Sequence, residues 1–567
     1  MGFRLSHQSD FPDSYAISED CVRLMVRASG NSSLAQLSVV YGDKYDEELR
    51  NRAELAVAGS DADFVYYTVD VPVPTRRLKY LFRAVANTGE TSWYGEAGFA
   101  DSRERALPFY QPYLCRRDLY QVPDWVDEAV CYQIFPERFA NGNPELTPSG
   151  AVGWLEAPTA SSMHGGDLPG ITSRLEYLSN LGVNVIYLTP IFRARSNHKY
   201  DTENYFEIDP QFGTDQDLRE LVGQAHARGI RVVLDAVFNH CGFQFEPFQD
   251  AIRRGTSSPY WDWFFIDGDE VDIDEVNYET FATKLRYMPK LNLANPEVEQ
   301  YFLNVAAYWL KRFDIDGWRL DVANEIDHVF WRRFRNTVKA IKPDALIVGE
   351  VWHYSLPWLR GDQFDGVMNY PLREHVLDLF VRRVTTPKSF AEGITRLQFQ
   401  YPMQATRAMF NLLGSHDTER VLTLADGDVD SVKLALVCQF TLPGIPMIYY
   451  GDELGMEGGP DPLCRGGMRW DLEEDSRGLK DLVSALARLR RENKAMQGER
   501  IDFSIATESC LRYTRKARDS HAVIGVQFAW LDEDGNWPDE AVVPDDEDML
   551  LSFVVQSRCA VYIWASR

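Results

Sequence analysis

Residues 231–240 have the sequence Arg-Val-Val-Leu-Asp-Ala-Val-Phe-Asn-His, an apolar run rich in valine that contains an acid near its end. Such a run is typical of a strand that is buried on both faces, as the strands of parallel sheets are. Similar runs recur between Trp125 and Tyr450, and amphipathic helical patterns separate most of them. Eight strands are therefore expected, over residues 130–135, 183–188, 231–237, 317–321, 345–350, 366–370, 408–413 and 446–450.

Eight strand-and-helix units favour one fold class, an α/β protein whose catalytic domain is a closed (β/α)8 TIM barrel, here assigned to residues 123–495. An open doubly wound sheet is less favoured, because no glycine-rich dinucleotide fingerprint is present. The connection after the third strand, residues 240–295, is too long for a simple loop and is rich in aromatic residues. We expect it to form a small inserted subdomain over the site. Helices are expected at residues 215–228, 296–313, 330–341 and 479–491.

The barrel is flanked by two regions in which short strand patterns replace helical ones. Residues 1–122 are predicted to be an N-terminal β-sandwich, because short alternating runs between residues 21 and 94 are separated by polar turns. A proline-rich, aperiodic segment at 106–123 is typical of a linker. Helical periodicity stops beyond Asn493, so residues 496–567 are predicted to form a C-terminal β-sandwich domain.

The overall composition excludes some classes of partner. A formal net charge of -26 disfavours nucleic acid and anionic membranes, since both select basic surfaces. The 14 Trp and 27 Tyr residues are available to stack on flat apolar ligand faces. The eight cysteines lack the close paired spacing of zinc sites and are expected to be reduced thiols. Without a signal sequence or a membrane-spanning apolar run, a cytoplasmic location is expected.

Acidic residues stand at the ends of four of the predicted strands. In a barrel, the active site is assembled from the carboxyl ends of the strands, where Asp235, Asp321, Glu350 and Asp417 are found. Any one of them alone is more simply a turn or helix-capping residue. Chance does not readily explain acids at four strand ends of one predicted barrel, so we interpret the four acids as parts of one site.

Two of these acids match the needs of retaining glycosidic cleavage, which uses one carboxylate as a nucleophile and a second to protonate the departing oxygen. Asp321 and Glu350 come from adjacent strands and are assigned these roles. Arg319 precedes Asp321 by two residues, so both side chains point to the same side of the strand. Asp417 is expected to stabilise the positively charged transition state. The nearby histidines expected to bind sugar hydroxyls as neutral imidazoles are His198, His240 and His416.

Four segments together resemble the defining motifs of glycoside hydrolase family 13, the α-amylase family, in order and spacing. They are residues 235–240, 317–322, 349–352 and 415–417. Three further segments and the preceding sandwich are similar to the neopullulanase, cyclomaltodextrinase and maltogenic amylase subgroup. Those segments are residues 288–292, 322–325 and 451–457.

The resemblance implies a function and a set of site residues. It implies hydrolysis of α-1,4-glucosidic bonds in cyclodextrins, pullulan and short malto-oligosaccharides, with some transglycosylation. It also implies a homodimer in which the starch-binding-like N-terminal domain of one subunit covers the barrel of the other. It carries over Asp321 as nucleophile, Glu350 as acid/base and Asp417 as transition-state stabiliser. Glu325 and Trp352 are similar to residues of the acceptor side. The residues carried over as a shell around the cleaved sugar are His198, Tyr200, Asp235, His240, Arg319 and His416.

No cofactor is required by this chemistry, but the resemblance raises calcium as a structural ion. Related enzymes bind it after the first strand through Asn and Asp oxygens. This chain retains only part of that set, because Leu146 and Thr147 stand where further oxygen donors are expected. The candidate ligands are Asn141, Asn143, Gly165 and Asp167.

Two alternatives remain open at the level of sequence. In a transglycosidase, a sugar hydroxyl rather than water intercepts the same covalent intermediate. In a non-catalytic carbohydrate-binding protein, the barrel persists without its chemistry, although the presence of Asp321, Glu350 and Asp417 argues against this.

Overall fold

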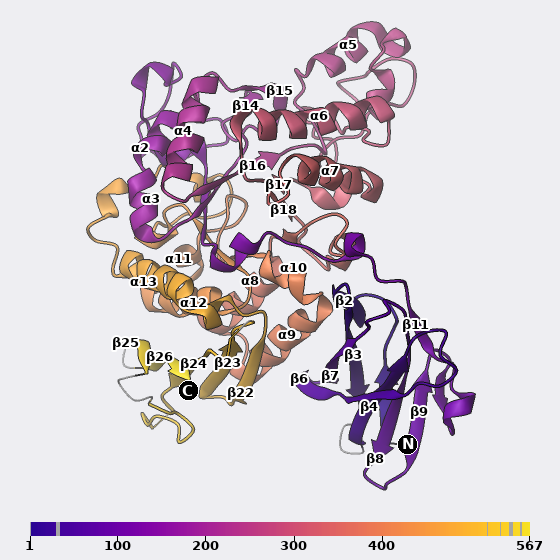
Figure 1. The fold of residues 1–567 in the computed structure, drawn as a ribbon. Helices are drawn as coiled ribbons and strands as arrows, with labels where there is room; N and C mark the ends of the chain where they lie inside the picture. Colours follow the sequence, from indigo (N-terminus) through magenta and orange to yellow (C-terminus); the bar gives the residue numbers. More distant parts are fainter. Residues whose placement is uncertain are drawn as a thin grey trace.

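The computed structural model describes residues 2–29, 34–518, 520–532, 534–543, 548–555 and 558–566. Three regions follow one another along the chain (Figure 1). A β-rich N-terminal domain lies beside a central region of alternating strands and helices, and a C-terminal sheet packs against the same region, next to the N-terminal domain. Among the helices of the described residues, none combines the length and apolar character that crossing a membrane would require.

The central region is the predicted barrel. Its eight strands are hydrogen-bonded in the order β19-β18-β17-β16-β13-β12-β21-β20, and all neighbouring pairs are parallel. A single bridge between Met368 and Phe410 joins the two ends of the sheet and closes the barrel. The strands are β12 (Cys131–Ile134), β13 (Val185–Leu188), β16 (Arg231–Ala236), β17 (Gly317–Leu320), β18 (Leu346–Gly349), β19 (Gly366–Val367), β20 (Phe410–Leu412) and β21 (Ile445–Tyr449).

Alternation along the strands separates the barrel interior from its outer face. In β12, Cys131 belongs to the apolar cluster inside the barrel, whereas Tyr132 and Ile134 pack outward against the helices. The interior is apolar at its lower levels and becomes polar near the carboxyl ends of the strands, where Gln133, Asp235 and Arg319 are buried. The barrel thus presents charged groups at one end of an otherwise apolar core.

The helices around the barrel begin where the sequence supplies caps. Thr214 and Asp217 form a capping box at the start of α4 (Asp215–Ala227). The carboxylate of Asp327 accepts two backbone N–H groups at the start of α7 (His328–Ile341). The other long helices of this region are α6 (Pro296–Phe313), α9 (Pro387–Gln400), α12 (Val429–Thr441) and α13 (Leu479–Glu492).

The segment between β16 and α6 is the insertion predicted after the third strand. It contains α5 (Glu246–Arg254) and short bridges, including His240 to Lys290 and Phe264 to Leu291. Figure 1 shows α5 at the upper edge of the molecule, beyond α6. Its aromatic side chains pack on one another, as in the pair Phe248 and Phe264, whose ring centroids are 4.9 Å apart.

The N-terminal domain is the predicted β-sandwich. One sheet has the order β1-β3-β7-β6 with β2 on β3, and the other has the order β10-β9-β8-β4-β5 with β11 on β8. Side chains such as Leu24 and Phe82 fill the core between them. The strands are β1 (Arg4–Ser6), β2 (Ser14–Ser18), β3 (Cys21–Ser29), β4 (Leu34–Gly42), β5 (Asn51–Glu54), β6 (Ala56–Ser60), β7 (Val65–Pro72), β8 (Leu78–Ala86), β9 (Thr91–Gly95), β10 (Gly98–Ala100) and β11 (Phe109–Gln111).

The C-terminal region is β-structure, as predicted, but its described strands form one antiparallel sheet instead of a two-sheet sandwich. The strand order is β22-β23-β24-β26-β25. Side chains of the barrel region cover one face of this sheet, for example Phe380 against Phe528 with ring centroids 4.8 Å apart. A second sheet is therefore not needed to bury that face. The strands are β22 (Ile501–Ala506), β23 (Cys510–Lys516), β24 (Val523–Trp530), β25 (Met549–Val555) and β26 (Cys559–Ser566).

Candidate active site

A cavity of about 640 Å³ opens at the carboxyl ends of the barrel strands. The three acids predicted to be catalytic, Asp321, Glu350 and Asp417, all line it. The insertion contributes an apolar wall, and the loop after β21 contributes a polar one. The residues of the apolar wall are Phe281, Leu285 and Met288, and those of the polar wall are Asp461, Pro462 and Arg465.

One guanidinium group connects the acids of the cavity floor. Nη1 of Arg319 lies 2.9 Å from Oδ1 of Asp321 and 3.0 Å from both carboxylate oxygens of Asp235. Nη2 of the same side chain lies 2.9 Å from Oε1 of Glu350. Arg319 is fully buried, so these contacts are shielded from water. The structure therefore brings Asp321 and Glu350 together around a single cation, as the adjacent strands predicted.

Glu350 also accepts hydrogen bonds from two N–H donors. The backbone N–H of Val322 donates to Oε2 at 3.0 Å, and the indole N–H of Trp352 donates to Oε1 at 3.1 Å. Val322 has a φ of 46°, a left-handed conformation that a β-branched residue rarely adopts. Trp352 stacks on Tyr370 with ring centroids 3.6 Å apart. These contacts fix the direction in which the Glu350 carboxyl faces the cavity.

Asp417 has a separate set of partners that sequence reasoning missed in part. Nη2 of Arg465 lies 3.3 Å from its Oδ1, and Nε2 of His416 lies 3.2 Å from its Oδ2. Arg465 also donates to the backbone carbonyl of His416 at 2.8 Å. Arg465 ends a short 3-10 helix (Leu463–Arg465) in the connection after the barrel strand β21, where no periodic pattern marks it as a site residue.

Asp321 and Asp417 hold protons more tightly than isolated carboxyls do, because their pKa values are raised. Burial raises the pKa of Asp321 well above its usual range, the carboxylates of Glu350 and Asp235 raise it further, and Arg319 opposes both. Burial, followed by the charge of Glu350, raises the pKa of Asp417 to about 7. Asp321 and Asp417 therefore keep their protons to a higher pH than free carboxyl groups do.

The three histidines predicted to bind sugar hydroxyls have lowered pKa values, which favours the neutral ring. Burial lowers the pKa of His198 and of His240 to about 3 each, and it lowers the pKa of His416 far below its usual value. His198 and His240 line the cavity, and the ring of His240 stacks on Phe281 with centroids 4.7 Å apart. Nε2 of His240 is buried and has no hydrogen-bond partner within the described residues.

The remaining predicted shell residues lie at different depths. Tyr200 lines the cavity, whereas Asp235 lies beneath the floor and accepts hydrogen bonds from the hydroxyls of Tyr187 at 2.6 Å and Tyr200 at 2.9 Å. Glu325 pairs instead with Lys290, with 3.1 Å between Oε2 and Nζ, and in the described structure it does not line the cavity.

The residues predicted to bind calcium lie together, but their polar atoms are used within the protein. The carboxylate of Asp167 accepts the backbone N–H groups of Gly142 and Asn143, each at 2.9 Å, and of Gly170 at 2.6 Å, which caps α2 (Leu168–Ser173). The side-chain amide of Asn141 donates to the carbonyl oxygen of Gly165 at 2.6 Å.

These contacts fit a hydrogen-bonded helix start better than a calcium site, which takes six to eight oxygens. Asp167 is the one carboxylate among the four candidate ligands. Nowhere in the described part of the chain do three or more His, Cys, Asp or Glu side chains form a metal-binding group. No step of the chemistry is assigned to a metal.

A closed (β/α)8 barrel with paired carboxylates at the ends of adjacent strands is the architecture of a glycoside hydrolase. Comparison with known proteins makes the assignment more specific. Residues 133–523 match the alpha amylase catalytic domain, and residues 4–115 match the alpha amylase N-terminal ig-like domain. The chain therefore belongs to the α-amylase family and, within it, to the cyclomaltodextrinase, neopullulanase and maltogenic amylase subgroup.

Individual relatives are similar over most of the chain. A protein named cyclomaltodextrinase from Geobacillus thermopakistaniensis (strain MAS1) is 49% identical over 513 residues, which cover 89% of this chain and 87% of the relative. Neopullulanase 2 from Thermoactinomyces vulgaris is 47% identical, with 85% and 83% of the two chains covered. A solved structure named cyclomaltodextrinase superposes with a TM-score of 0.89 at 39% identity, covering 99% of this chain and 97% of the other.

Proposed function

We propose that this chain hydrolyses α-1,4-glucosidic bonds of cyclodextrins, pullulan and short malto-oligosaccharides with retention of the anomeric configuration. The observation that carries the proposal is the contact of one buried guanidinium, Arg319, with both Asp321 and Glu350 on the floor of the cavity. Relatives named for cyclodextrin and pullulan hydrolysis support the substrate class.

In the first step, a carboxylate oxygen of Asp321 attacks the anomeric carbon, while Glu350 gives a proton to the departing glycosidic oxygen. The step needs Asp321 charged and Glu350 protonated. Arg319 favours the charged form of Asp321 through the 2.9 Å contact with its Oδ1.

In the second step, Glu350 acts as a base and removes a proton from water, which attacks the anomeric carbon and releases Asp321. A sugar hydroxyl in place of this water gives transglycosylation. Asp417 stabilises the positive charge that develops on the sugar ring in both steps. Its 3.3 Å contact with Arg465 and 3.2 Å contact with His416 hold the carboxylate toward the cavity.

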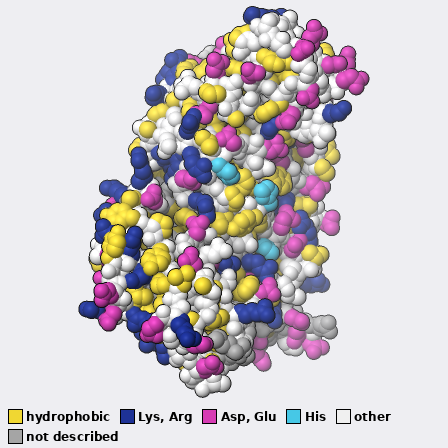
Figure 2. Space-filling model, turned by 90° about the vertical axis from the view of Figure 1, so that its right-hand side faces the viewer, with side chains coloured by type: hydrophobic (Ala, Val, Ile, Leu, Met, Phe, Trp, Pro, Cys, Tyr) yellow, Lys and Arg dark blue, Asp and Glu magenta, His cyan; other side chains and the backbone are white. Residues whose placement is uncertain are grey.

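The lining of the cavity suits a neutral sugar. His198, Tyr200 and His240 provide neutral polar groups, while Phe281 and Trp352 provide aromatic surface on which an apolar sugar face can pack. Acidic and basic side chains are interspersed over the face drawn in Figure 2, without a continuous basic area. This distribution and the net charge of -26 argue against nucleic acid as a partner.

We also propose that the chain forms a homodimer through its N-terminal domain. Large exposed aromatic side chains on and beside this domain support the proposal, since aromatic residues are enriched at interfaces. Tyr45 is 74% exposed and Tyr113 is 49% exposed, and both rings lie within 6 Å of the Arg77 guanidinium. A cytoplasmic location is proposed because all eight cysteines are free thiols, which suits a reducing compartment.

The proposed activity is tested by measuring kcat/KM on β-cyclodextrin, pullulan and soluble starch, with the anomer of the first product followed by NMR. The expected result is hydrolysis of all three, preference for β-cyclodextrin over starch, and α-anomeric first products. Release of β-anomeric products would contradict retention. Light scattering on the same sample measures molar mass and tests the dimer.

A further inference from the structure

Gln133 lies beneath the proposed catalytic floor and has no part in the mechanism above. It belongs to β12, points into the barrel, and is fully buried. Across the sheet it is in register with Tyr187 of β13 and Tyr449 of β21. Nε2 of its side-chain amide lies 2.7 Å from Nδ1 of His416, the residue directly before Asp417.

Asp235 determines which groups donate in the hydrogen bonds that join it to Tyr200 and His416. Its two carboxylate oxygens each lie 3.0 Å from Arg319, which carries a permanent charge, so Asp235 is the ionised partner and accepts hydrogen bonds. The hydroxyl of Tyr200 lies 2.9 Å from Oδ2 of Asp235. Since a hydroxyl has one proton, Tyr200 donates it to Asp235.

The next link fixes the proton on His416. The hydroxyl oxygen of Tyr200 is 2.6 Å from Nε2 of His416 and, with its own proton committed, can only accept. His416 must therefore carry a proton on Nε2. The second neighbour of Nε2 is Oδ2 of Asp417 at 3.2 Å, which accepts this proton when Asp417 is ionised. A neutral imidazole has one ring proton, so Nδ1 is left with a lone pair.

We propose that Gln133 is a positioning residue that sets the ring proton of His416: its amide donates to Nδ1, and the chain of hydrogen bonds then runs from Gln133 through His416 and Tyr200 to Asp235. This inference rests on the proposed function. If the amide of Gln133 were turned over, its oxygen would face Nδ1 and the ring proton of His416 would lie there. The lone pair of Nε2 would then face Asp417, and Tyr200 would have to donate to Nε2 instead of to Asp235. Gln133 thereby keeps Asp417 and the Tyr200 ring oriented toward the bound glucose.

Substituting Gln133 changes what Nδ1 meets. In Q133M, Nδ1 loses its donor while the side chain keeps a similar volume, so the ring keeps its proton on Nε2 but is held less firmly. We expect kcat to fall about 10- to 100-fold, as for other residues that orient a functional imidazole, with a smaller change in KM. In Q133E, the carboxylate can only accept, so Nδ1 is expected to become protonated.

The decisive readout is the protonation of the His416 ring in the resting protein, without substrate. It is measured by NMR of selectively 15N-histidine-labelled protein, with the resonances assigned by their loss in H416Q. The wild type is expected to carry its proton on Nε2 alone, Q133M to do the same, and Q133E to carry a proton on Nδ1. A wild-type ring protonated on Nδ1, or a Q133E ring protonated on Nε2 alone, would overturn the proposal.

A matched control separates positioning from general destabilisation. Gln439 is also a buried glutamine, and its amide donates to the carbonyl oxygens of Asn411 and Met447 at 2.8 Å each, away from His416. Q439M should lower the thermal midpoint but leave both the ring proton and kcat unchanged. Equal kcat values for Q133M and Q439M would overturn the inference. If the ring proton is as expected but the wild type hydrolyses no α-glucan, the proposed function fails and the assignment of the proton stands.

Discussion

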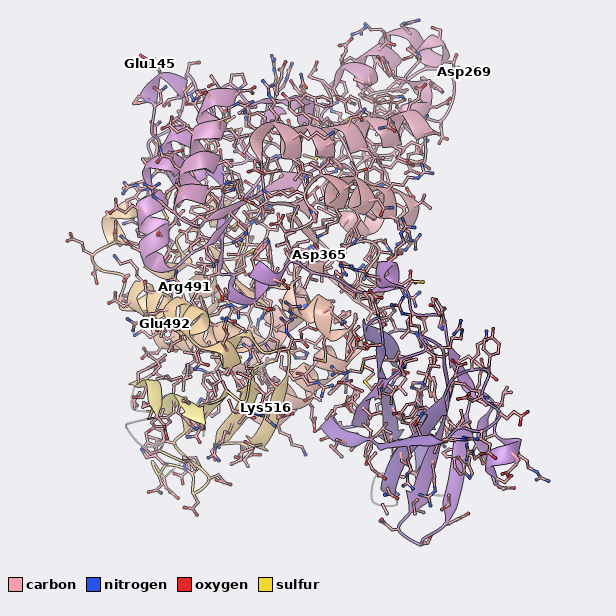
Figure 3. The ribbon with its side chains drawn as sticks, viewed as in Figure 1. Glu145, Asp269, Asp365, Arg491, Glu492 and Lys516 are labelled. Carbon is pink, nitrogen blue, oxygen red and sulfur yellow. The ribbon has the colours of Figure 1, made fainter. Side chains whose placement is uncertain are left out.

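Two buried clusters of charged side chains lie close to β18 and have opposite balances of charge. At the carboxyl end of the strand, Arg319 alone faces Asp235, Asp321 and Glu350. Near its other end, Asp365 faces two cations, with Nη1 of Arg335 at 2.7 Å and Nζ of Lys339 at 2.8 Å. Figure 3 labels Asp365 in the interior of the molecule, between the barrel and the N-terminal domain.

The pKa values of the two clusters move in opposite directions. Burial would raise the pKa of Asp365, but Lys339 and Arg335 outweigh it and hold the pKa below its usual range. Burial and neighbouring carboxylates raise the pKa of Asp321 beyond what Arg319 can offset. A cluster with sufficient cations stabilises the fold, whereas a cluster with excess acids retains protons that a reaction can use.

The largest expected effect is loss of activity at the acid-rich cluster. D321N removes the nucleophile and should lower kcat by about 10⁴-fold or more, while the fold persists because a buried negative charge has been removed from a cluster with too many. The measurement is kcat on β-cyclodextrin together with the thermal midpoint. Asp269, exposed on the insertion and labelled in Figure 3, provides the control, since D269N should change neither. Retention of a tenth of the wild-type kcat in D321N would contradict the assignment.

The cation-rich cluster should respond in the opposite way. D365N leaves the buried Arg335 and the partly buried Lys339 without the carboxylate that contacts both, and should cost about 3–5 kcal/mol of stability. Below the unfolding temperature its kcat should stay close to that of the wild type, because Asp365 does not line the cavity in the described structure. Thermal unfolding and kcat measured on the same preparation check both statements. A D365N protein that is fully stable would show that the cluster does not support the fold.

A smaller effect is expected in the dependence of stability on pH. The pKa of Asp417 is about 7 in the folded protein, against about 3.9 for an unfolded Asp. The folded state therefore binds this proton more tightly, and the contribution of Asp417 to stability decreases as the pH rises from about 4 to about 7. Asp365 has the opposite sign, since its contribution is complete above about pH 4 and is lost only as the pH falls further through its lowered pKa.

The comparison of wild type and D417N isolates this contribution. D417N should reduce the loss of thermal stability between pH 5 and pH 8 by a few degrees relative to the wild type. An identical pH profile for the two proteins would indicate that the pKa of Asp417 is not raised in the folded protein.

The smallest effect is expected from calcium. Because the Asp167 carboxylate is committed to three backbone N–H groups, added millimolar calcium should shift the thermal midpoint by less than about 1 °C, since weak binding adds little stability. Isothermal titration calorimetry with calcium measures this binding directly and does not depend on an activity assay. Binding in the micromolar range would show that the helix start at Asp167 rearranges around the ion.

The sequence predicted the barrel and its acids because both depend on local patterns. Apolar runs mark strands wherever both faces are buried, and the carboxyl ends of parallel strands meet at one end of a barrel. This reasoning placed Asp321 and Glu350 together, and the structure shows them around Arg319.

Other features of the site depend on tertiary contacts that no local pattern contains. Arg465 ends a short 3-10 helix in the connection after β21, and only the folded chain brings it to Asp417. Gln133 stands within a strand that the sequence identified, but nothing in its spacing indicates a contact with His416, 283 residues away. The prediction of a two-sheet sandwich at the C-terminus was wrong for the same reason. The barrel region covers one face of the single C-terminal sheet, and this contact is not visible in the sequence.

The most direct test of the account is the identity of the residue that becomes covalently attached to the sugar. In E350Q, an α-maltosyl fluoride with a second fluorine on the reacting ring needs no acid to release fluoride, and hydrolysis of the intermediate is slowed by the loss of the base. Mass spectrometry of the digested protein should find the added glycosyl mass on Asp321. A stable adduct on another residue, such as Asp417, or no adduct after fluoride is released, would contradict the account.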